Sequence, residues 1–293
     1  TVTPNAVAGS VSGTTPLCPT ATATYTASGV VLGGGTGSWS SSTTATATVV
    51  SSTGVVTAVA TGGGTTNIIY TITGGCGGTK SALQALTVTP NAVVTSVTGT
   101  SPLCIGASAA YTANGVVLGG GTGAWSSSST AVATVAANGT VTAVTAGSTN
   151  IIYTITGGCG GTKSALKALT VNPNAAITSV SGTTPLCPGA TATYTASGVV
   201  LGGGTGAWSS SSTSIATVAA NGTVTAVATG GGSTNIIYTI TGGCTGTKSA
   251  QQLLTVTPNA VVTSVSGTSP LCPGATATYT ASGVVLGGGT GSW

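Results

Sequence analysis

Apolar residues alternate with Ser and Thr along most of the chain, in short segments bounded by Gly, Pro or Asn. Such alternation predicts β-strands with one face toward a core, separated by tight turns. Asn138-Gly139 lies between two of these segments and is a strong hairpin signal. No segment keeps a helical period. Residues 90–172 therefore predict a Pro-Leu-Cys corner at 102–104 and seven strands, at 92–98, 108–113, 124–127, 131–136, 140–144, 149–156 and 164–171.

This pattern recurs along the whole chain. A Pro-Asn-Ala motif begins at Pro4, Pro90, Pro173 and Pro258, with spacings of 86, 83 and 85 residues. Such a period exceeds that of solenoid repeats and suits a small Greek-key β-sandwich. We expect an all-β chain of tandem modules of about 85 residues, arranged head to tail. The expected segments are the end of a preceding module (1–3), repeat 1 (4–89), repeat 2 (90–172), repeat 3 (173–257) and repeat 4 (258–293), the N-terminal part of a fourth module.

The composition excludes most chemistry. The 293 residues include no Asp, Glu or His, and the only charged side chains are four lysines. General acid–base catalysis lacks its usual groups, and Ser or Cys nucleophiles lack an activating base. Calcium and zinc lack their preferred ligands, four lysines make no track for nucleic acid, and no apolar run is long enough to span a membrane. We expect no enzyme, no catalytic residue, no metal site and no cofactor.

One stretch carries a family resemblance. Residues 123–155 read GAWSSSSTAVATVAANGTVTAVTAGSTNIIYTI, with a Trp-Ser-Ser-Ser run, a Val-Ala-Thr-Val strand, an Asn-Gly hairpin and a glycine-containing turn before the next strand. This pattern resembles the bacterial immunoglobulin-like (Ig-like) repeats of type 2. The paired Pro-Leu-Cys and Gly-Gly-Cys motifs resemble Ig-like modules of very large secreted proteins of Bacteroidota, including those that build grappling-hook filaments. The resemblance implies adhesin stalks and surface fibres.

Aromatic residues recur at fixed positions of the repeats. A tryptophan lies in the third expected strand, and a tyrosine lies in the Ile-Ile-Tyr-Thr-Ile strand. They could stack against a ligand, but the central tryptophan of an Ig-like sandwich packs in the core. We therefore expect the core to contain Trp39, Trp125, Trp208, Tyr70, Tyr153 and Tyr238. The hydroxyl group of each of these tyrosines is expected to reach a backbone group.

Each complete repeat has two cysteines, which in an exported Ser/Thr/Gly-rich chain indicates disulfides. The seven cysteines are Cys18, Cys76, Cys104, Cys159, Cys187, Cys244 and Cys272. Two pairings are open. The simpler one lies within repeats and joins Cys18 to Cys76, Cys104 to Cys159 and Cys187 to Cys244.

The second pairing is staggered between repeats. In an Ig-like topology the first cysteine of a repeat lies at the corner between strands A and B, and the second lies in the hairpin between strands F and G. These places are about one strand length apart, beyond the reach of a disulfide. In a head-to-tail stack, the first cysteine instead faces the second cysteine of the next repeat. This slightly favours Cys18–Cys159 and Cys104–Cys244, with Cys76, Cys187 and Cys272 pairing outside the sequence.

A nearly uncharged β-protein risks edge-to-edge aggregation when it is free in solution, but suits a permanently packed fibre. The sequence thus predicts an extracellular, cell-surface-attached filament or stalk. Its partners would be copies of the same chain packed laterally and a cell-surface target at a distal tip. The alternative is an adhesin module that recognises a glycan or protein through loops at one end. Near-identity of the repeats favours the filament, because recognition tips usually differ from their stalks.

Overall fold

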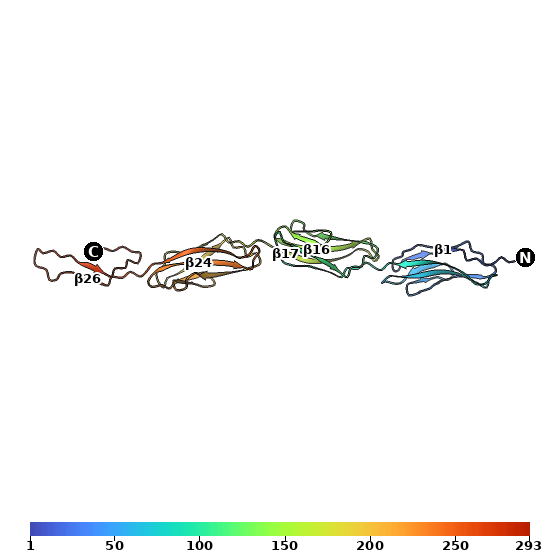
Figure 1. Ribbon diagram of the computed structural model, residues 1–293, viewed down its shortest axis with the longest axis horizontal. Coiled ribbons are helices and arrows are strands. Elements are labelled where there is room, and N and C mark those ends of the chain that lie inside the picture. Colours follow the sequence, from blue (N-terminus) through green and yellow to red (C-terminus); the bar gives the residue numbers. More distant parts are fainter. The chain divides into compact units, whose positions relative to one another are not determined.

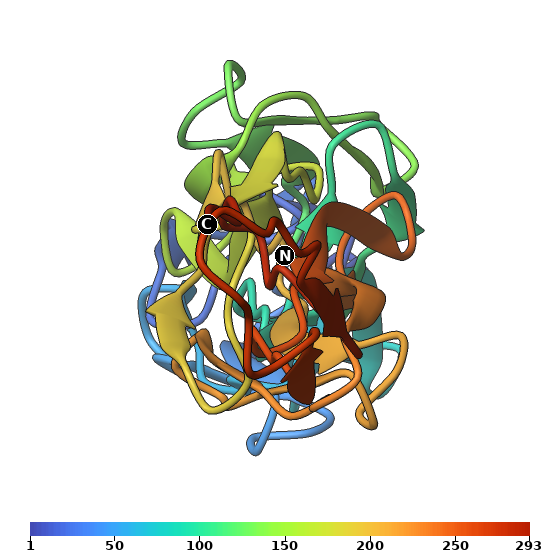
Figure 2. The ribbon, with the colours of Figure 1, turned by 90° about the vertical axis from the view of Figure 1, so that its left-hand side faces the viewer.

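The computed structural model describes all 293 residues, which form 27 strands and no helix. Figures 1 and 2 accordingly show arrows joined by loops, without a coiled ribbon. No helix is present that is long and apolar enough to cross a membrane. The chain divides into two compact units. Unit 1 comprises Thr1–Ser101, Ala107–Val144 and Ser148–Thr170, and unit 2 comprises Pro102–Gly106, Thr145–Gly147 and Val171–Trp293.

Repeat 1 lies in unit 1 and folds as two facing sheets with a small third pair. Its strands are β1 (Ser10–Ser12), β2 (Thr22–Thr24), β3 (Thr26–Ser28), β4 (Thr36–Ser41), β5 (Ala47–Val49), β6 (Val55–Ala58), β7 (Gly64–Thr73) and β8 (Lys80–Val88). One sheet has the order β2-β6-β5, the other has the order β4-β7-β8, and β1 pairs with β3. With β2 as strand B, these are the B-E-D and C-F-G sheets of an immunoglobulin-type sandwich.

Repeats 2 and 3 use the same plan. Repeat 2 has β9 (Ser96–Thr98), β10 (Leu103–Cys104), β11 (Ser108–Ala110), β12 (Thr112–Asn114), β13 (Thr122–Ser127), β14 (Ala133–Val135), β15 (Thr140–Ala143), β16 (Gly147–Thr156) and β17 (Lys163–Asn172). Repeat 3 has β18 (Ser179–Ser181), β19 (Thr191–Thr193), β20 (Thr195–Ser197), β21 (Thr205–Ser210), β22 (Ala216–Val218), β23 (Thr223–Ala226), β24 (Gly232–Thr241) and β25 (Lys248–Val256). Repeat 4 has only β26 (Ser264–Ser266) and β27 (Thr280–Ser282), which pair antiparallel.

The expected strands of repeat 2 need three corrections. The first is shorter than expected, because only Ser96–Thr98 pairs continuously and Val93 makes a single bridge. The second divides into β11 and β12, which pair with different partners, β15 and β9. The expected corner at 102–104 contains a short strand, β10, which pairs in parallel with the end of β17. The expected hairpin at Asn138 is present, between β14 and β15.

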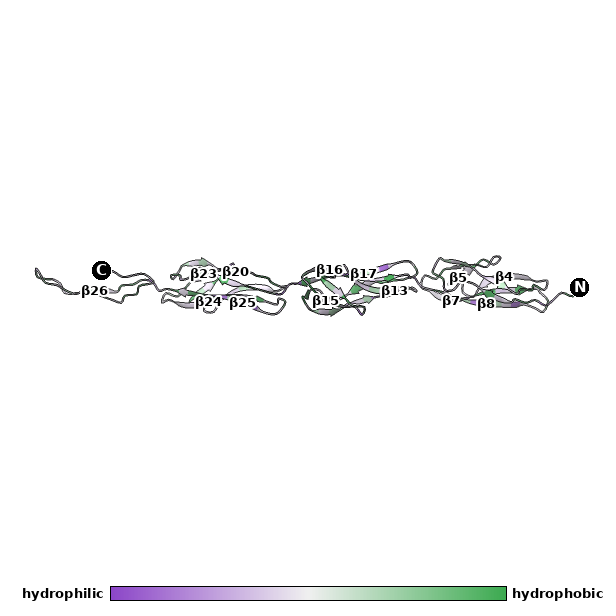
Figure 3. Cartoon of the chain, turned by 90° about the horizontal axis from the view of Figure 1, so that it is seen from above, coloured by the Kyte–Doolittle hydropathy of each residue, from purple (hydrophilic) through white to green (hydrophobic).

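The core of each complete repeat is mainly aliphatic and includes one buried tyrosine, which Trp39 joins in repeat 1. In repeat 1 it comprises Leu17, Tyr25, Trp39, Ala47, Val56, Ala58, Ile68, Leu86 and Val88. These residues come from both sheets, so the alternation along each strand turns one face inward, as the pattern predicts. Figure 3 shows mostly pale to green ribbon and little purple, in keeping with a chain that is 1% charged.

Candidate functional site at the cysteine junctions

The first cysteine of a repeat lies where the last strand of that repeat ends. In repeat 1, Leu17 bridges Val88 at the end of β8. The Leu17 amide donates to the Thr87 carbonyl (3.0 Å), and the Thr89 amide donates to the Leu17 carbonyl (2.9 Å). Cys18 is therefore fixed beside the point at which the chain leaves repeat 1. In the same way, Cys104 pairs with Asn172 at the end of β17.

The second cysteine lies where its own repeat begins. The Cys159 carbonyl accepts a hydrogen bond from the Ala92 amide (2.7 Å), and the Cys159 amide donates to the Gly119 carbonyl (2.8 Å). The Cys244 carbonyl accepts the corresponding bond from Ala175 (2.9 Å). The loop after strand F is thereby held against the first residues of the repeat.

These two placements bring cysteines of consecutive repeats together. Thr89, beside Cys18, is three residues from Ala92, which holds Cys159, so the two sites are within about 11 Å along the chain. The structure contains the staggered disulfides: Cys18–Cys159, with a Cα–Cα distance of 5.4 Å, and Cys104–Cys244, with a Cα–Cα distance of 5.5 Å. The first lies within unit 1 and the second within unit 2.

The pairing within repeats does not occur, for a geometric reason. Cys76 is bound to Ala6 and Gly33 near the start of β8, whereas Cys18 lies at the end of that strand. The nine residues of β8 span about 25–30 Å, whereas bridged Cα atoms must lie within about 7 Å. Cys76, Cys187 and Cys272 are exposed free thiols. Cys159 and Cys244, at the same position of their repeats as Cys76, are buried.

Glycines shape the loop that carries the second cysteine. A Cβ on Gly121 would collide with the Thr156 carbonyl oxygen and lie 2.5 Å from the Gly158 nitrogen. A Cβ on Gly119 would lie 2.6 Å from the Ala92 nitrogen, and Gly119 also has a φ of +60°. The glycine run at 119–121 is therefore required for close packing of backbone against the cysteine loop.

The aromatic residues expected in the core lie in it or pack against it, but most of them are only partly covered. Trp39 is buried, but Trp125, Trp208, Tyr70, Tyr153 and Tyr238 are only half-buried. Each tryptophan faces the tyrosine directly opposite on the neighbouring strand, with ring centroids 5.0 Å apart. The ring of each strand-F tyrosine packs on a glycine of the partner strand, as the Tyr70 ring packs on Gly37. This contact places the three tyrosines near the edge of the core.

The deeply buried tyrosines are a different set, Tyr25, Tyr111 and Tyr194. Their hydroxyl groups, rather than those of the strand-F tyrosines, donate to backbone carbonyls, as Tyr111 does to Thr100 at 2.7 Å. A glycine packs on each ring: a Cβ on Gly99 would lie 2.5 Å from the Tyr111 ring. Burial raises the pKa of all three phenols above 10.0. The sequence signal for this set was the alternation of each tyrosine with small residues.

No group of three or more Cys, His, Asp or Glu side chains could hold a metal ion. A hollow in repeat 1 has a volume of about 370 Å³ and is bordered by Trp39, Tyr70, Tyr25 and neighbouring Ser and Thr residues. It contains no charged group. It could accommodate an uncharged polar ligand, but it has no group for acid–base chemistry.

Comparison with known proteins agrees with this architecture. Residues 82–164 match the family described as Bacterial Ig-like domain (group 2). The chain consists of tandem Ig-like β-sandwich repeats. No curated protein matches it.

Several solved structures are similar over most of the chain at low identity. Surface layer protein SbsC, domains 1–6, is 18% identical, with a TM-score of 0.29, over 91% of this chain and 42% of that one. Protocadherin Gamma B2 extracellular cadherin domains 3–6 are 11% identical, with a TM-score of 0.37, over 90% and 77%. The N-terminal eight Ig domains of Down Syndrome Cell Adhesion Molecule are 11% identical, with a TM-score of 0.42, over 86% and 37%. The chain thus spans less than half of the first and third of these structures.

Proposed function

We propose that the chain is a structural segment of an extracellular filament or adhesin stalk, which gives reach and mechanical strength to attachment between a cell and a surface, host or prey. The observation that carries this proposal is that consecutive repeats are joined covalently, by Cys18–Cys159 and by Cys104–Cys244. A recognition module has no need of such bonds, whereas a load-bearing array benefits from one at every junction.

Each disulfide provides a second covalent route past a repeat boundary. Without it, tension passes only through the short connection between repeats, such as residues 89–92. With it, the corner after β1 of one repeat is tied to the cysteine loop of the next. Disulfides of this kind persist in oxidising surroundings, which supports an extracellular location and, in our proposal, attachment to the cell surface.

The nearly uncharged surface supports lateral packing of copies of the same chain. Leu83 and Leu166 occupy equivalent positions on the outer faces of β8 and β17, and they are 58% and 57% exposed. Exposed apolar side chains at the same place in successive repeats suit a packed fibre better than a chain free in solution. The motifs that resemble giant secreted Bacteroidota proteins support a gliding or predatory cell as the setting, with a target bound at a distal tip.

The covalent junctions can be tested with trypsin, because the only cleavage sites are Lys80, Lys163, Lys167 and Lys248. Free thiols are blocked, and the chain is denatured without reductant and digested. The staggered bonds keep fragments 1–80, 81–163 and 168–248 together as one species. Reduction of the same sample separates them and serves as the control. Pairing within repeats would release the three fragments singly, and would remove the observation that carries the proposal.

The filament itself is tested by electron microscopy of native material labelled with antibodies against this chain. We expect laterally packed fibres that carry label along their length. Dispersed single strings, or label confined to fibre tips, would contradict the structural role.

A second candidate is an adhesin module that binds a glycan or protein. The hollow beside the Trp39–Tyr70 pair favours it, because the half-buried Tyr70 presents an aromatic ring on which a sugar ring could stack. Binding of soluble glycans that is lost on Tyr70→Ala, with an unchanged thermal unfolding temperature, would support this function. Binding that is unchanged by this substitution would exclude this hollow as its site.

A further inference from the structure

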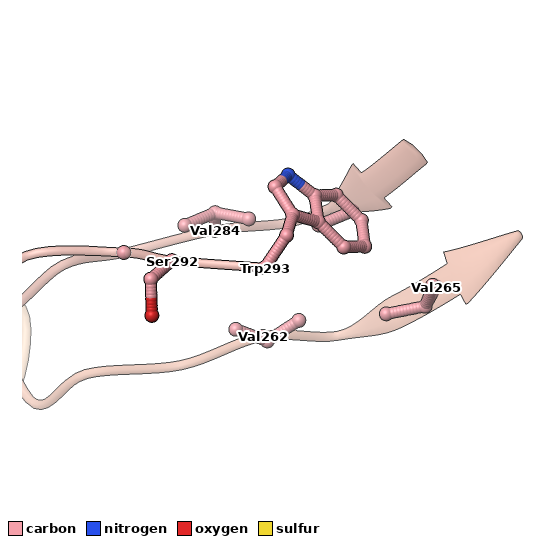
Figure 4. A pocket seen from close by; sticks show the side chains of 7 residues that line it. Val262, Val265, Val284, Ser292 and Trp293 are labelled. Carbon is pink, nitrogen blue, oxygen red and sulfur yellow. The ribbon is translucent and has the colours of Figure 1, made fainter. Parts of the chain in front are cut away.

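Outside the cysteine junctions, and apart from the four lysines, the reactive side chains of this protein are hydroxyls and amides. A hydroxyl lacks the base that would activate it, because the chain has no His, Asp or Glu. The hollow in Figure 4, for example, offers the hydroxyl of Ser292 among the apolar side chains of Val262, Val284 and Trp293, and no ionisable group. An asparagine amide needs no such base when a glycine follows it, because the backbone supplies the nucleophile.

Three asparagines of the chain precede a glycine, in the pairs Asn114-Gly115, Asn138-Gly139 and Asn221-Gly222. Because glycine has no Cβ, its backbone nitrogen can approach the asparagine side chain closely. That nitrogen loses its proton and attacks Cγ, so that a new C–N bond forms, the Cγ–Nδ2 bond breaks and ammonia leaves. Water then opens the cyclic succinimide at either carbonyl. The product is a carboxylate, carried by aspartate or isoaspartate.

Two of the three pairs lie in hairpins that restrain this reaction. The Gly139 amide, which would be the nucleophile, donates to the Ala136 carbonyl at 2.9 Å. The Asn138 side-chain oxygen accepts a hydrogen bond from the Thr140 amide at 3.0 Å. The Asn221-Gly222 pair of repeat 3 makes the same two hydrogen bonds, at 2.9 and 3.0 Å. Attack at either pair must therefore break the turn that closes the hairpin.

The third pair is arranged differently. Asn114 is the last residue of β12, and the backbone nitrogen of the exposed Gly115 makes no hydrogen bond. The Asn114 amide nitrogen, which would be the leaving group, donates to Ser96 Oγ and to Thr98 Oγ1, both at 3.2 Å. A hydroxyl can rotate and donate in its turn, so both groups can give a proton to the departing nitrogen. The nucleophile is thus free, and the leaving group lies beside proton donors.

The turn also requires its glycine. Gly115 has a φ of +60°, and a Cβ at this position would collide with Thr95 Oγ1. The position of Asn114, in contrast, is variable, because Ser28, Ser197 and Ser282 stand there in the other repeats, each followed by a glycine. Repeat 2 is therefore the repeat in which this turn carries an amide, and serine is a replacement that the fold already accommodates.

We propose that Asn114 is a site of self-modification, which loses its amide in the folded protein without an enzyme. Water is the only co-reactant, and ammonia is the leaving group. The reaction gives the chain an acidic side chain, of which it otherwise has none, and lowers its net charge from +4 to +3. The new carboxylate can accept hydrogen bonds from the hydroxyls of Ser96 and Thr98. This inference does not depend on the filament proposal.

The first test compares the three pairs within one chain. The folded, oxidised protein is incubated at mildly alkaline pH in water labelled with heavy oxygen and is digested in ordinary water, so that only modification during the incubation carries the label. Fragmentation mass spectrometry then locates the label. We expect Asn114 to react at least tenfold faster than Asn138 and Asn221, whereas in the denatured chain all three should react at similar rates. A hairpin asparagine that reacts as fast as Asn114 in the folded chain would overturn the proposal, as would an Asn114 that reacts only after denaturation.

The second test follows the new charge in the intact protein by isoelectric focusing. We expect the aged parent chain to gain a band that focuses with fresh Asn114→Asp chain. The matched control is Asn114→Ser, which should fold as the parent does and should form this band at least tenfold more slowly. Thermal unfolding of the fresh chains checks that all three are folded. An acidic band that forms equally fast in the Asn114→Ser chain would refute the assignment to Asn114.

Discussion

The staggered disulfides limit how far the chain can be pulled. In the oxidised chain the shortest covalent route from Thr1 to Trp293 follows residues 1–18, crosses to Cys159, returns to Cys104, crosses to Cys244 and continues to the end. This route has 17, 55 and 49 residue steps, 121 in all, against 292 for the reduced chain. At about 3.3–3.6 Å per residue, reduction should lengthen the fully extended chain by about 560–620 Å.

The assay is single-molecule force spectroscopy on a chain held by its two ends, before and after addition of a reductant. The background must carry Cys76→Ser, Cys187→Ser and Cys272→Ser. Pairing within repeats would give 122 steps in the unsubstituted chain, nearly the same length as the staggered pairing. In the substituted background the staggered chain keeps 121 steps, whereas pairing within repeats leaves only Cys104–Cys159 and a route of 237 steps.

A further substitution in this background tests the overlap of the two covalent loops. Cys104→Ser removes Cys104–Cys244 and leaves only Cys18–Cys159, which gives a route of 151 steps. Loss of Cys104–Cys244 therefore adds 30 steps, and the further loss of Cys18–Cys159 on reduction adds 141. This inequality follows from loops that share residues 104–159. An oxidised length near 237 steps, or equal increments for the two bonds, would refute the reasoning.

Three further predictions concern repeat 2. Because burial raises the pKa of Tyr111, the neutral phenol stabilises the fold below pH 10, and this stability is lost as the pH rises above 10. In an alkaline titration followed by circular dichroism, Tyr111→Phe should therefore lose less stability than the parent chain. An equal loss in both chains would contradict this origin. The buried Thr149 hydroxyl accepts a hydrogen bond from the Ser129 amide at 2.9 Å, and Thr149→Val removes this hydroxyl while keeping the shape of the side chain. The substitution should lower the free energy of unfolding in urea by about 1–3 kcal/mol. A decrease below about 0.5 kcal/mol would show that the hydroxyl network contributes little to stability. Gly121→Ala should prevent closure of the cysteine loop and lower the yield of the Cys18–Cys159 disulfide in non-reducing mass spectrometry. The control Gly161→Ala, at an open site with a φ of +80°, should cost only about 1–2 kcal/mol and leave the disulfide intact. Equal disulfide yields in the two variants would count against the packing role of Gly121.

Strand positions were accessible from sequence because they depend on local patterns. The Asn138-Gly139 hairpin forms as expected, and the Thr140 amide donates to the Asn138 side chain at 3.0 Å. The long alternating segment at 149–156 lies within β16. In each case the signal lies within a few residues, where turn geometry and the two-residue period of a strand decide the outcome.

The buried tyrosine could not be assigned with the same certainty. Tyr25 alternates with alanines and Tyr70 with isoleucines, but alternation indicates only which face of a strand a side chain is on and not how deeply it is covered. Tyr25 is buried because Gly13 packs on its ring and the Thr14 carbonyl accepts its hydroxyl hydrogen, and both contacts depend on how strands distant in sequence are placed. Tyr70 lies opposite Trp39, at a less covered position of the C-F-G sheet.

The sequence by itself determined the repeat length, the number of cysteines and the absence of charged chemistry, because these are properties of composition and period. It left two disulfide pairings open. Only the tertiary structure decided between them, through contacts between residues about 70 apart: the parallel bridge of Leu17 to Val88, and the hydrogen bond from Ala92 to Cys159. These contacts place one cysteine at the exit of a repeat and the other at the entrance of the next. A disulfide requires its cysteines to be close in space, and strand pairing rather than sequence spacing sets that distance.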